Sequence, residues 1–178
     1  MGKRNLIIGG AVVAGLAIVA GLALPLSNLG MREVDAIFLE KVQDPALKEL
    51  LPIFKNKCLD CHSTGAQLPF YAGLPGISGQ VQADRKKALA WWDVDLEWLE
   101  GDIPESSLAK MQQVLEDGNM PPMMYKTLHW KSSVTDEESQ AILSWIRSKR
   151  AKANGLDPTD KLVSRSVLPM QKRPVPPA

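Results

Sequence analysis

Two cysteines and a histidine carry the clearest chemistry in this sequence. Cys58 and Cys61 are separated by two residues, and His62 follows directly, which spells the pattern C-x-x-C-H. Two thiols at this spacing can each add to a vinyl group at one edge of a porphyrin, while the adjacent imidazole reaches the iron as the proximal ligand. The pattern therefore predicts one covalently attached haem of the c type.

Three other interpretations of the same residues stay open at this point. A C-x-x-C pair can be a thioredoxin-like redox motif, although no βαβ strand pattern precedes it here. A zinc site made of Cys58, Cys61, His62 and His129 is chemically possible, but the adjacent Cys61 and His62 are poorly placed to bind one ion together. A chance occurrence is the third interpretation, and the export segment described below argues against it. Cys58 and Cys61 are the only cysteines in the 178 residues, so no structural disulfide competes for them.

The second axial ligand is predicted from a methionine-rich segment. Met120 precedes two prolines in an expected loop between helices, where a flexible thioether can reach the haem face opposite His62. Met120 is therefore the first choice. Met123 and Met124 are close competitors, and His129 is a rival of a different kind because ligation by two imidazoles lowers the reduction potential relative to His/Met.

The N-terminus is expected to set the compartment. Lys3 and Arg4 precede a charge-free run from Asn5 to Met31, whose apolar part is about as long as the ~20 residues that cross a bilayer as a helix. The positive-inside bias leaves the N-terminus in the cytoplasm and translocates the chain from Arg32 onward. The sequence thus predicts a single-pass protein of the inner membrane with its C-x-x-C-H on the periplasmic side. A small-residue cleavage site ending at Ala23 is tolerable, but the apolar run is longer than a usual signal peptide, which favours an uncleaved anchor.

Composition bounds the remainder of the chain. The 21 basic and 20 acidic residues are interspersed and leave a net charge of +1, so nothing indicates a nucleic-acid partner. Beyond the N-terminal helix roughly 145 residues remain, which is enough for one domain. We expect an anchor at 1–31, a haem domain at 32–153, and an extended Pro-rich tail at 154–178.

The haem domain is expected to be mainly α-helical. Leu47, Leu50, Leu51 and Phe54 fall at helical spacing, so a helix over 46–57 should lead into the motif, with Pro52 interrupting or kinking it. Residues 63–79 are rich in Gly and Pro and predict a loop.

The second half of the domain should add helices. A short helix near 84–92 is plausible, within a tryptophan-rich stretch where core filling is expected for at least one of Trp91, Trp92 and Trp98. Pro104 should open a helix that Gly118 ends, with Met111 in its core-facing stripe. A capping box formed by Thr135 and Glu138 should start a last helix that runs to about residue 152.

These residues resemble a known family. The order of Phe54, C-x-x-C-H, Met120-Pro121 and a closing helix with an aromatic residue is similar to that of class I cytochromes c. The pattern is still closer to the haem-binding domain family of bacterial exported proteins, and the resemblance covers about residues 45–150. It rests on matches at Cys58-x-Asp60-Cys61-His62-Ser63, Pro69-x-Tyr71, Gly118-x-Met120-Pro121, Tyr125, Leu128-His129 and Trp145. The resemblance implies a class I-like fold with a single haem, and it carries Met120 as the matching distal position.

Electron transfer is the function expected from these features. A haem held by His62 and Met120 would exchange single electrons with redox protein partners, as a subunit or partner of a respiratory or photosynthetic membrane complex, without bond chemistry of its own. The alternative is a haem-based sensor or a peroxidase-like enzyme with an open or displaceable sixth position. For that chemistry His129 is the only distal histidine that could act as an acid or base.

Overall fold

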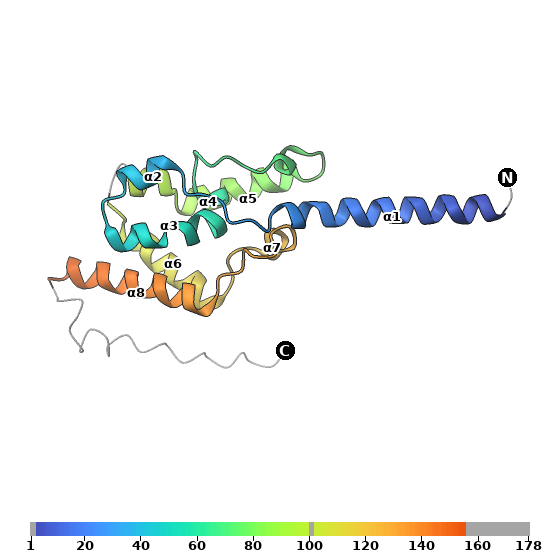
Figure 1. Ribbon diagram of the computed structural model, residues 1–178. Coiled ribbons are helices and arrows are strands. Elements are labelled where there is room, and N and C mark those ends of the chain that lie inside the picture. Colours follow the sequence, from blue (N-terminus) through green and yellow to red (C-terminus); the bar gives the residue numbers. More distant parts are fainter. Residues whose placement is uncertain (1–2, 100–101, 156–178) are drawn as a thin grey trace, which may run out of the picture. The chain divides into compact units, whose positions relative to one another are not determined.

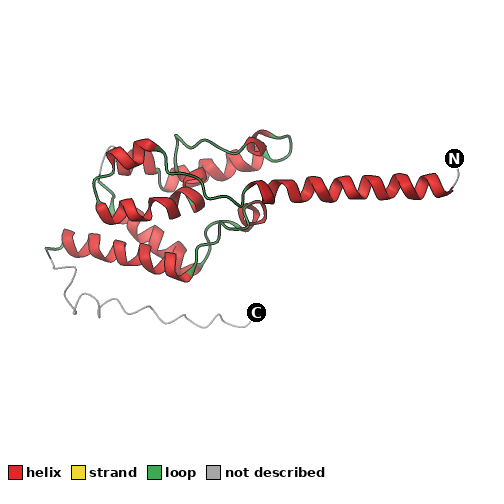
Figure 2. Ribbon diagram, viewed as in Figure 1, coloured by secondary structure: helices red, strands yellow, loops and turns green. Residues whose placement is uncertain are grey.

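The computed structural model describes residues 3–99 and 102–155. Within this part of the chain every regular element is a helix, so the expected mainly helical fold is confirmed (Figure 2). By its internal contacts the chain divides into a unit of residues 1–135 and a unit of residues 136–178. The Pro-rich tail predicted at 154–178 lies outside the described residues from position 156 onward, and the domain boundaries stay predictions.

Helix α1 (Lys3–Ser27) is the long apolar helix expected at the N-terminus (Figure 1). Its stretch Ile8–Ser27 is long and apolar enough to cross a membrane and is almost entirely exposed. A signal sequence near the N-terminus can also contain a helix this long and apolar. The membrane anchor, its sidedness and its retention therefore stay predictions.

Helices α2 (Ala36–Lys41) and α3 (Pro45–Lys57) build the core that precedes the motif. Asp44 caps α3 by accepting hydrogen bonds from Ala46 N and Leu47 N, at 3.0 and 3.4 Å, and Pro45 occupies the first turn where its missing N–H costs nothing. The helix continues through Pro52, so the expected interruption is not found. The predicted apolar stripe is confirmed, since its four members are all buried, namely Leu47, Leu50, Leu51 and Phe54.

The middle of the chain is more helical than its sequence pattern indicates. A 3₁₀ turn, η1 (Phe70–Gly73), interrupts the expected loop, and α5 (Ser78–Trp91) begins six residues earlier than the predicted helix over 84–92. None of the α5 residues is buried, so the helix has no apolar stripe that would have revealed it.

An aromatic cluster follows α5. A single π-helical turn, η2 (Asp95–Leu99), places Trp98 edge-on against Phe54, with the ring centroids 4.8 Å apart. The ring centroids of Trp92 and Trp98 are 5.4 Å apart. Trp92 and Trp98 are buried, which confirms core filling, whereas Trp91 is 70% exposed.

Helix α6 (Glu105–Asp117) ends as predicted at Gly118, whose φ of +64° is the left-handed conformation typical of a helix C-terminus. Met111 is buried on α6, as expected. A short helix that was not predicted, α7 (Met123–Leu128), then follows the Met-Pro segment. In the second unit, α8 (Asp136–Ala153) agrees with the predicted last helix.

Candidate functional site

The C-x-x-C-H motif forms one turn at the junction of α3 and α4 (Leu59–His62). Cys58 ends α3 and begins α4, and its carbonyl oxygen accepts hydrogen bonds from Cys61 N and His62 N at 3.1 and 3.0 Å. The motif thus places its two cysteines three residues apart along a single helical turn. Neither of the two cysteines is in a disulfide, both are half-buried, and burial raises the pKa of the Cys61 thiol to about 11.

The imidazole of His62 is oriented by a distant backbone group. Its Nδ1 lies 3.1 Å from the carbonyl oxygen of Trp92, which can only accept, so Nδ1 carries the proton and donates. Burial lowers the pKa of His62 and keeps the ring neutral. In this tautomer Nε2 holds the lone pair, which is the state and the nitrogen that a metal requires.

Two carboxylates anchor the segment that follows His62: within it Asp93 binds Thr64, and Asp95 binds three residues. Asp95 accepts hydrogen bonds from Ser63 Oγ, Thr64 Oγ1 and Gly65 N at 2.8, 3.0 and 2.7 Å. Because Asp95 lies only three residues after Trp92, the same stretch of chain holds both the His62 ring and the loop beyond it. Nothing in the sequence pattern distinguishes Asp95 from other aspartates, and its role was not predicted.

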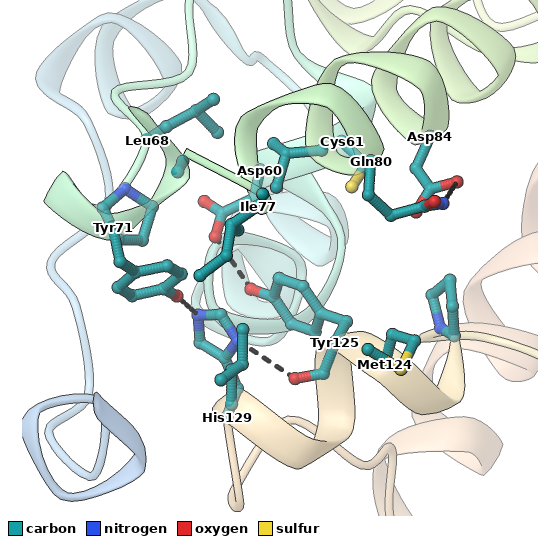
Figure 3. Close-up of a pocket in the computed structure, with 16 residues that line it drawn as sticks. Asp60, Cys61, Leu68, Tyr71, Ile77, Gln80, Asp84, Met124, Tyr125 and His129 are labelled. Atoms are coloured by element: carbon teal, nitrogen blue, oxygen red, sulfur yellow. Dashed lines mark hydrogen bonds between the residues drawn. The ribbon is translucent and has the colours of Figure 1, made fainter. Parts of the chain in front are cut away.

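A buried aspartate inside the motif links it to the residues after α1 and to α7. Asp60 is 4% exposed and forms an ion pair with Arg32, whose Nη1 lies 2.6 Å from Oδ1. Its other oxygen accepts a hydrogen bond from Tyr125 Oη at 2.8 Å (Figure 3). Burial and the neighbouring Asp60 raise the pKa of Tyr125, so its hydroxyl stays a donor. Arg32 was not predicted, although Asp60 and Tyr125 both appear in the motif matches quoted above.

His129 is engaged through both ring nitrogens. Its Nδ1 donates to the Tyr125 carbonyl oxygen at 3.1 Å, and its Nε2 accepts from the hydroxyl of Tyr71 (Figure 3). The ring also stacks on that of Tyr125, with centroids 3.9 Å apart and an interplanar angle of 11°. Burial lowers the pKa of His129 and raises that of Tyr71 to about 12, so both groups are neutral near pH 7.

A cavity of about 160 Å³ lies between these groups and α5. Three of the predicted site residues, Cys61, Met124 and His129, contribute to its wall (Figure 3). The remaining wall is mostly apolar and includes Leu68, Ile77, Val81 and Leu128. Cys58, His62, Met120 and Met123 are not among the residues that line it.

The candidate distal methionines all lie within five residues between α6 and the start of α7. Met120 is 39% exposed, and Met123 and Met124 are 73% and 66% exposed. This placement agrees with the expected loop position of Met120, and the choice among the three stays a prediction. The zinc alternative gains no support, because no group of three or more His, Cys, Asp or Glu side chains in the described part of the chain is placed to hold a metal ion.

The residues of the motif fit a haem on their own chemistry. Two cysteines that form no disulfide share one turn, and a neutral imidazole is held with Nε2 available. Arg85 donates to the Ser63 carbonyl oxygen at 2.8 Å, while its buried Nε has no hydrogen-bond partner among the described residues. An unsatisfied cationic donor beside the motif suits an anionic group such as a haem propionate.

Comparisons with known proteins agree with this chemistry. The family described as "Haem-binding domain" matches residues 30–148. The chain is also similar to cytochrome c peroxidase Ccp of Escherichia coli strain K12, with 34% identity over 120 residues, which cover 62% of this chain and 25% of the relative. The chain thus spans about a quarter of the length of the curated relative that it matches. No solved structure matches significantly.

Proposed function

Because this chain belongs to the haem-binding domain family, we propose that it is a monohaem c-type cytochrome that carries single electrons. Cys58 and Cys61 would hold the haem through thioether bonds, and His62 Nε2 would be the proximal ligand. Bound haem supplies a one-electron iron couple. The observation that carries the proposal is the His62 hydrogen bond to the Trp92 carbonyl, which leaves Nε2 for the iron one residue after a free thiol.

We place Met120 opposite His62, with Met123 and Met124 as the nearest alternatives. The hydrogen bonds of His129 support a thioether over a second imidazole. If His129 Nε2 bound a metal, the buried Tyr71 hydroxyl would lose its acceptor, and an unmade buried hydrogen bond costs about 1–3 kcal/mol. A thioether ligand requires no such rupture and favours the reduced state of the iron.

The proposed setting is the periplasmic face of the inner membrane, with α1 as a single-pass anchor. The partners would be redox proteins of a membrane complex that dock on residues 32–135 of the first unit, called the haem unit below. An anchor confines electron exchange to partners at the same surface and raises their effective concentration. The apolar composition and exposure of Ile8–Ser27 support this setting.

The alternative is a peroxidase-like enzyme or a sensor, and the name of the Escherichia coli relative favours the peroxidase. That protein is about four times as long as the matched region, so its name describes more than the segment shared with this chain. Within this chain, His129 is the histidine other than His62 that could act as an acid or base in peroxide chemistry, and its two nitrogens are both hydrogen-bonded. This supports electron transfer as the proposed function.

Absorption spectra of the purified full-length protein test the proposal. Oxidised and reduced samples are compared with and without carbon monoxide for the wild type, Met120→Ala and the control Met124→Ala. We expect a low-spin spectrum with a thioether-to-iron band that carbon monoxide changes only in Met120→Ala. A haem that stays low-spin and covalently bound in His62→Ala would contradict the proximal ligand.

Ready carbon monoxide binding by the wild type would instead favour the sensor or enzyme. Loss of the thioether band in Met124→Ala and its retention in Met120→Ala would move the distal ligand to Met124. Neither result depends on the partner, so the haem assignment is tested separately from the electron-transfer role.

A further inference from the structure

The end of α1 is tied directly to two elements of the haem unit. Asn28, one residue after α1, donates through Nδ2 to the Leu128 carbonyl oxygen at 3.0 Å and to Tyr71 Oη at 3.3 Å. Arg32 continues the connection, since its backbone N donates to Asn56 Oδ1 at 2.7 Å and its side chain binds Asp60. The junction between α1 and the haem unit is therefore a hydrogen-bonded contact with η1 and α7 rather than a free linker.

These contacts set the depth of η1 and α7 if α1 crosses the bilayer. The apolar stretch Ile8–Ser27 has 20 residues and spans about 30 Å as a helix, which equals the hydrocarbon thickness of a bilayer. Asn28 then lies at the boundary with the headgroups. Each headgroup layer adds roughly 5–8 Å, so groups hydrogen-bonded to Asn28 lie within it.

The surface beside this junction is apolar and exposed. Phe70 is 73% exposed in η1, and Leu74 directly after it is 40% exposed. Met123 is 73% exposed on α7, and Trp130, just beyond α7, is 50% exposed. Large apolar side chains and tryptophan at this depth are typical of residues that enter the membrane interface.

The charges of the same segments also favour contact with the membrane interface. No aspartate or glutamate occurs between Cys61 and Ala83 or between Gly118 and Thr135, although the chain has 20 acidic residues. The charged side chains of these two segments, apart from the histidines, are those of Lys126 and Lys131. Two segments without carboxylates and with two lysines add no electrostatic repulsion from anionic phospholipids.

We propose that η1 with Leu74, together with α7 and Trp130, forms a lipid-contacting surface that seats the haem unit on the headgroups of the membrane that α1 spans. This rests on the proposed membrane anchor. The haem unit then does not swing freely on a tether but keeps one face on the bilayer. Both η1 and α7, which contribute to the wall of the cavity beside Cys61, are then held at the level of the membrane surface.

Photolabelling from the lipid tests this surface in the full-length, haem-loaded protein. The protein is placed in nanodiscs of phosphatidylethanolamine and phosphatidylglycerol that contain a phospholipid with a diazirine near its headgroup, and labelled peptides are mapped by mass spectrometry. We expect labelling of the η1 and α7 peptides on the order of tenfold above that of the Trp91 peptide, the ratio that 1.4 kcal/mol of preferential lipid contact supports. Trp91 is a matched reference because it is 70% exposed and ends α5, about 20 Å along the helix from its start.

A pair of variants sharpens the test. Phe70→Asp should reduce labelling of the η1 peptide on the order of tenfold, whereas Trp91→Asp should leave it unchanged. An unchanged haem spectrum verifies that each variant is folded. Labelling of α1 without labelling of η1 and α7 would overturn the proposal and leave the anchor intact.

Two other outcomes also overturn it. Absence of label in α1 would contradict the anchor itself, and the lipid surface with it, while the haem spectra would still test the electron-carrier function. Protection of η1 and α7 by a co-purified protein instead of lipid would assign the surface to a protein partner.

Discussion

At the scale of single residues, the environment of His62 depends on groups far away in the sequence. The carbonyl of Trp92, 30 residues away, sets the tautomer of the His62 ring. The Asp95 carboxylate accepts hydrogen bonds from the three residues that follow His62. Orientation of a metal-binding imidazole through its second nitrogen usually affects metal affinity and redox properties as much as a ligand does. The effect of the residues that orient His62 on the haem can therefore be tested by mutation, as the effect of His62 itself can.

Asp95→Ala is expected to loosen the segment after His62. The change removes the acceptor for three hydrogen bonds on a partly exposed loop, and we expect a loss of about 2 kcal/mol in the free energy of unfolding with a shift in the haem reduction potential. Denaturant unfolding and redox titration measure the two effects. The exposed Asp102, changed to Ala, is the matched control. Equal potentials in the two variants would mean that Asp95 does not position His62.

His129 is expected to make stability depend on pH. Burial lowers its pKa in the folded protein below the ordinary value of 6.5, so in mildly acidic solution the unfolded chain binds a proton that the folded chain does not. The free energy of unfolding should fall as pH decreases from about 7 through the lowered pKa. His129→Gln should flatten that slope in urea unfolding measured over this range. A slope as steep as in the wild type would place the effect on another group.

At the scale of elements, the end of helix α6 sets the direction of the Met-Pro segment that follows it. Gly118 ends α6 with a φ of +64°, and the segment with Met120 departs from this residue. An L-residue in this conformation is strained, because its Cβ approaches its own backbone. The direction of the segment is thus set by one backbone conformation.

Gly118→Ala is expected to destabilise the protein by about 1 kcal/mol. Apart from the residue itself and its two chain neighbours, no atom lies within 4 Å of an added Cβ, so the cost comes from the local backbone alone. Gly79→Ala is the matched control, since this glycine lies in the first turn of α5 with equal space around it and should be neutral or stabilising. Thermal unfolding gives the melting temperature of each variant, and equal changes from the wild type would contradict backbone strain at Gly118.

At the scale of the whole molecule, the residues just after α1 are hydrogen-bonded to the haem unit. The expected anchor ended at residue 31, yet Asn28 hydrogen-bonds to Tyr71 and Leu128. Asn28 therefore contributes to the unit that contains the motif.

Two truncations behind a cleavable export signal test this connection. A chain that begins at Asn28 should be a soluble haem protein with wild-type spectra. A chain that begins at Arg32 should be less stable by about 1–3 kcal/mol, because the side chain that bonds Tyr71 and Leu128 is gone. Membrane association of the first truncation after detergent-free lysis would contradict α1 as the single anchor. Equal stability of the two chains would show that the Asn28 contacts are dispensable.

The sequence by itself determined the features whose signals are local. The C-x-x-C-H motif is readable because its five positions are contiguous, and the helical stripe before Phe54, the stop at Gly118 and the apolar N-terminal run are periodic or compositional patterns. The family assignment is confirmed by the match over residues 30–148. Haem attachment, the ligands and the partners stay predictions.

Only the tertiary structure decided which groups hold the motif in place. The partner of His62 is a backbone carbonyl, and every residue has one, so no side-chain pattern could identify Trp92. Helix α5 has no buried stripe, and Asp95 resembles any surface aspartate until the chain brings it beside Gly65. Hydrogen bonds between distant segments depend on how the chain is packed, and packing is set by the whole core rather than by a local pattern of residues.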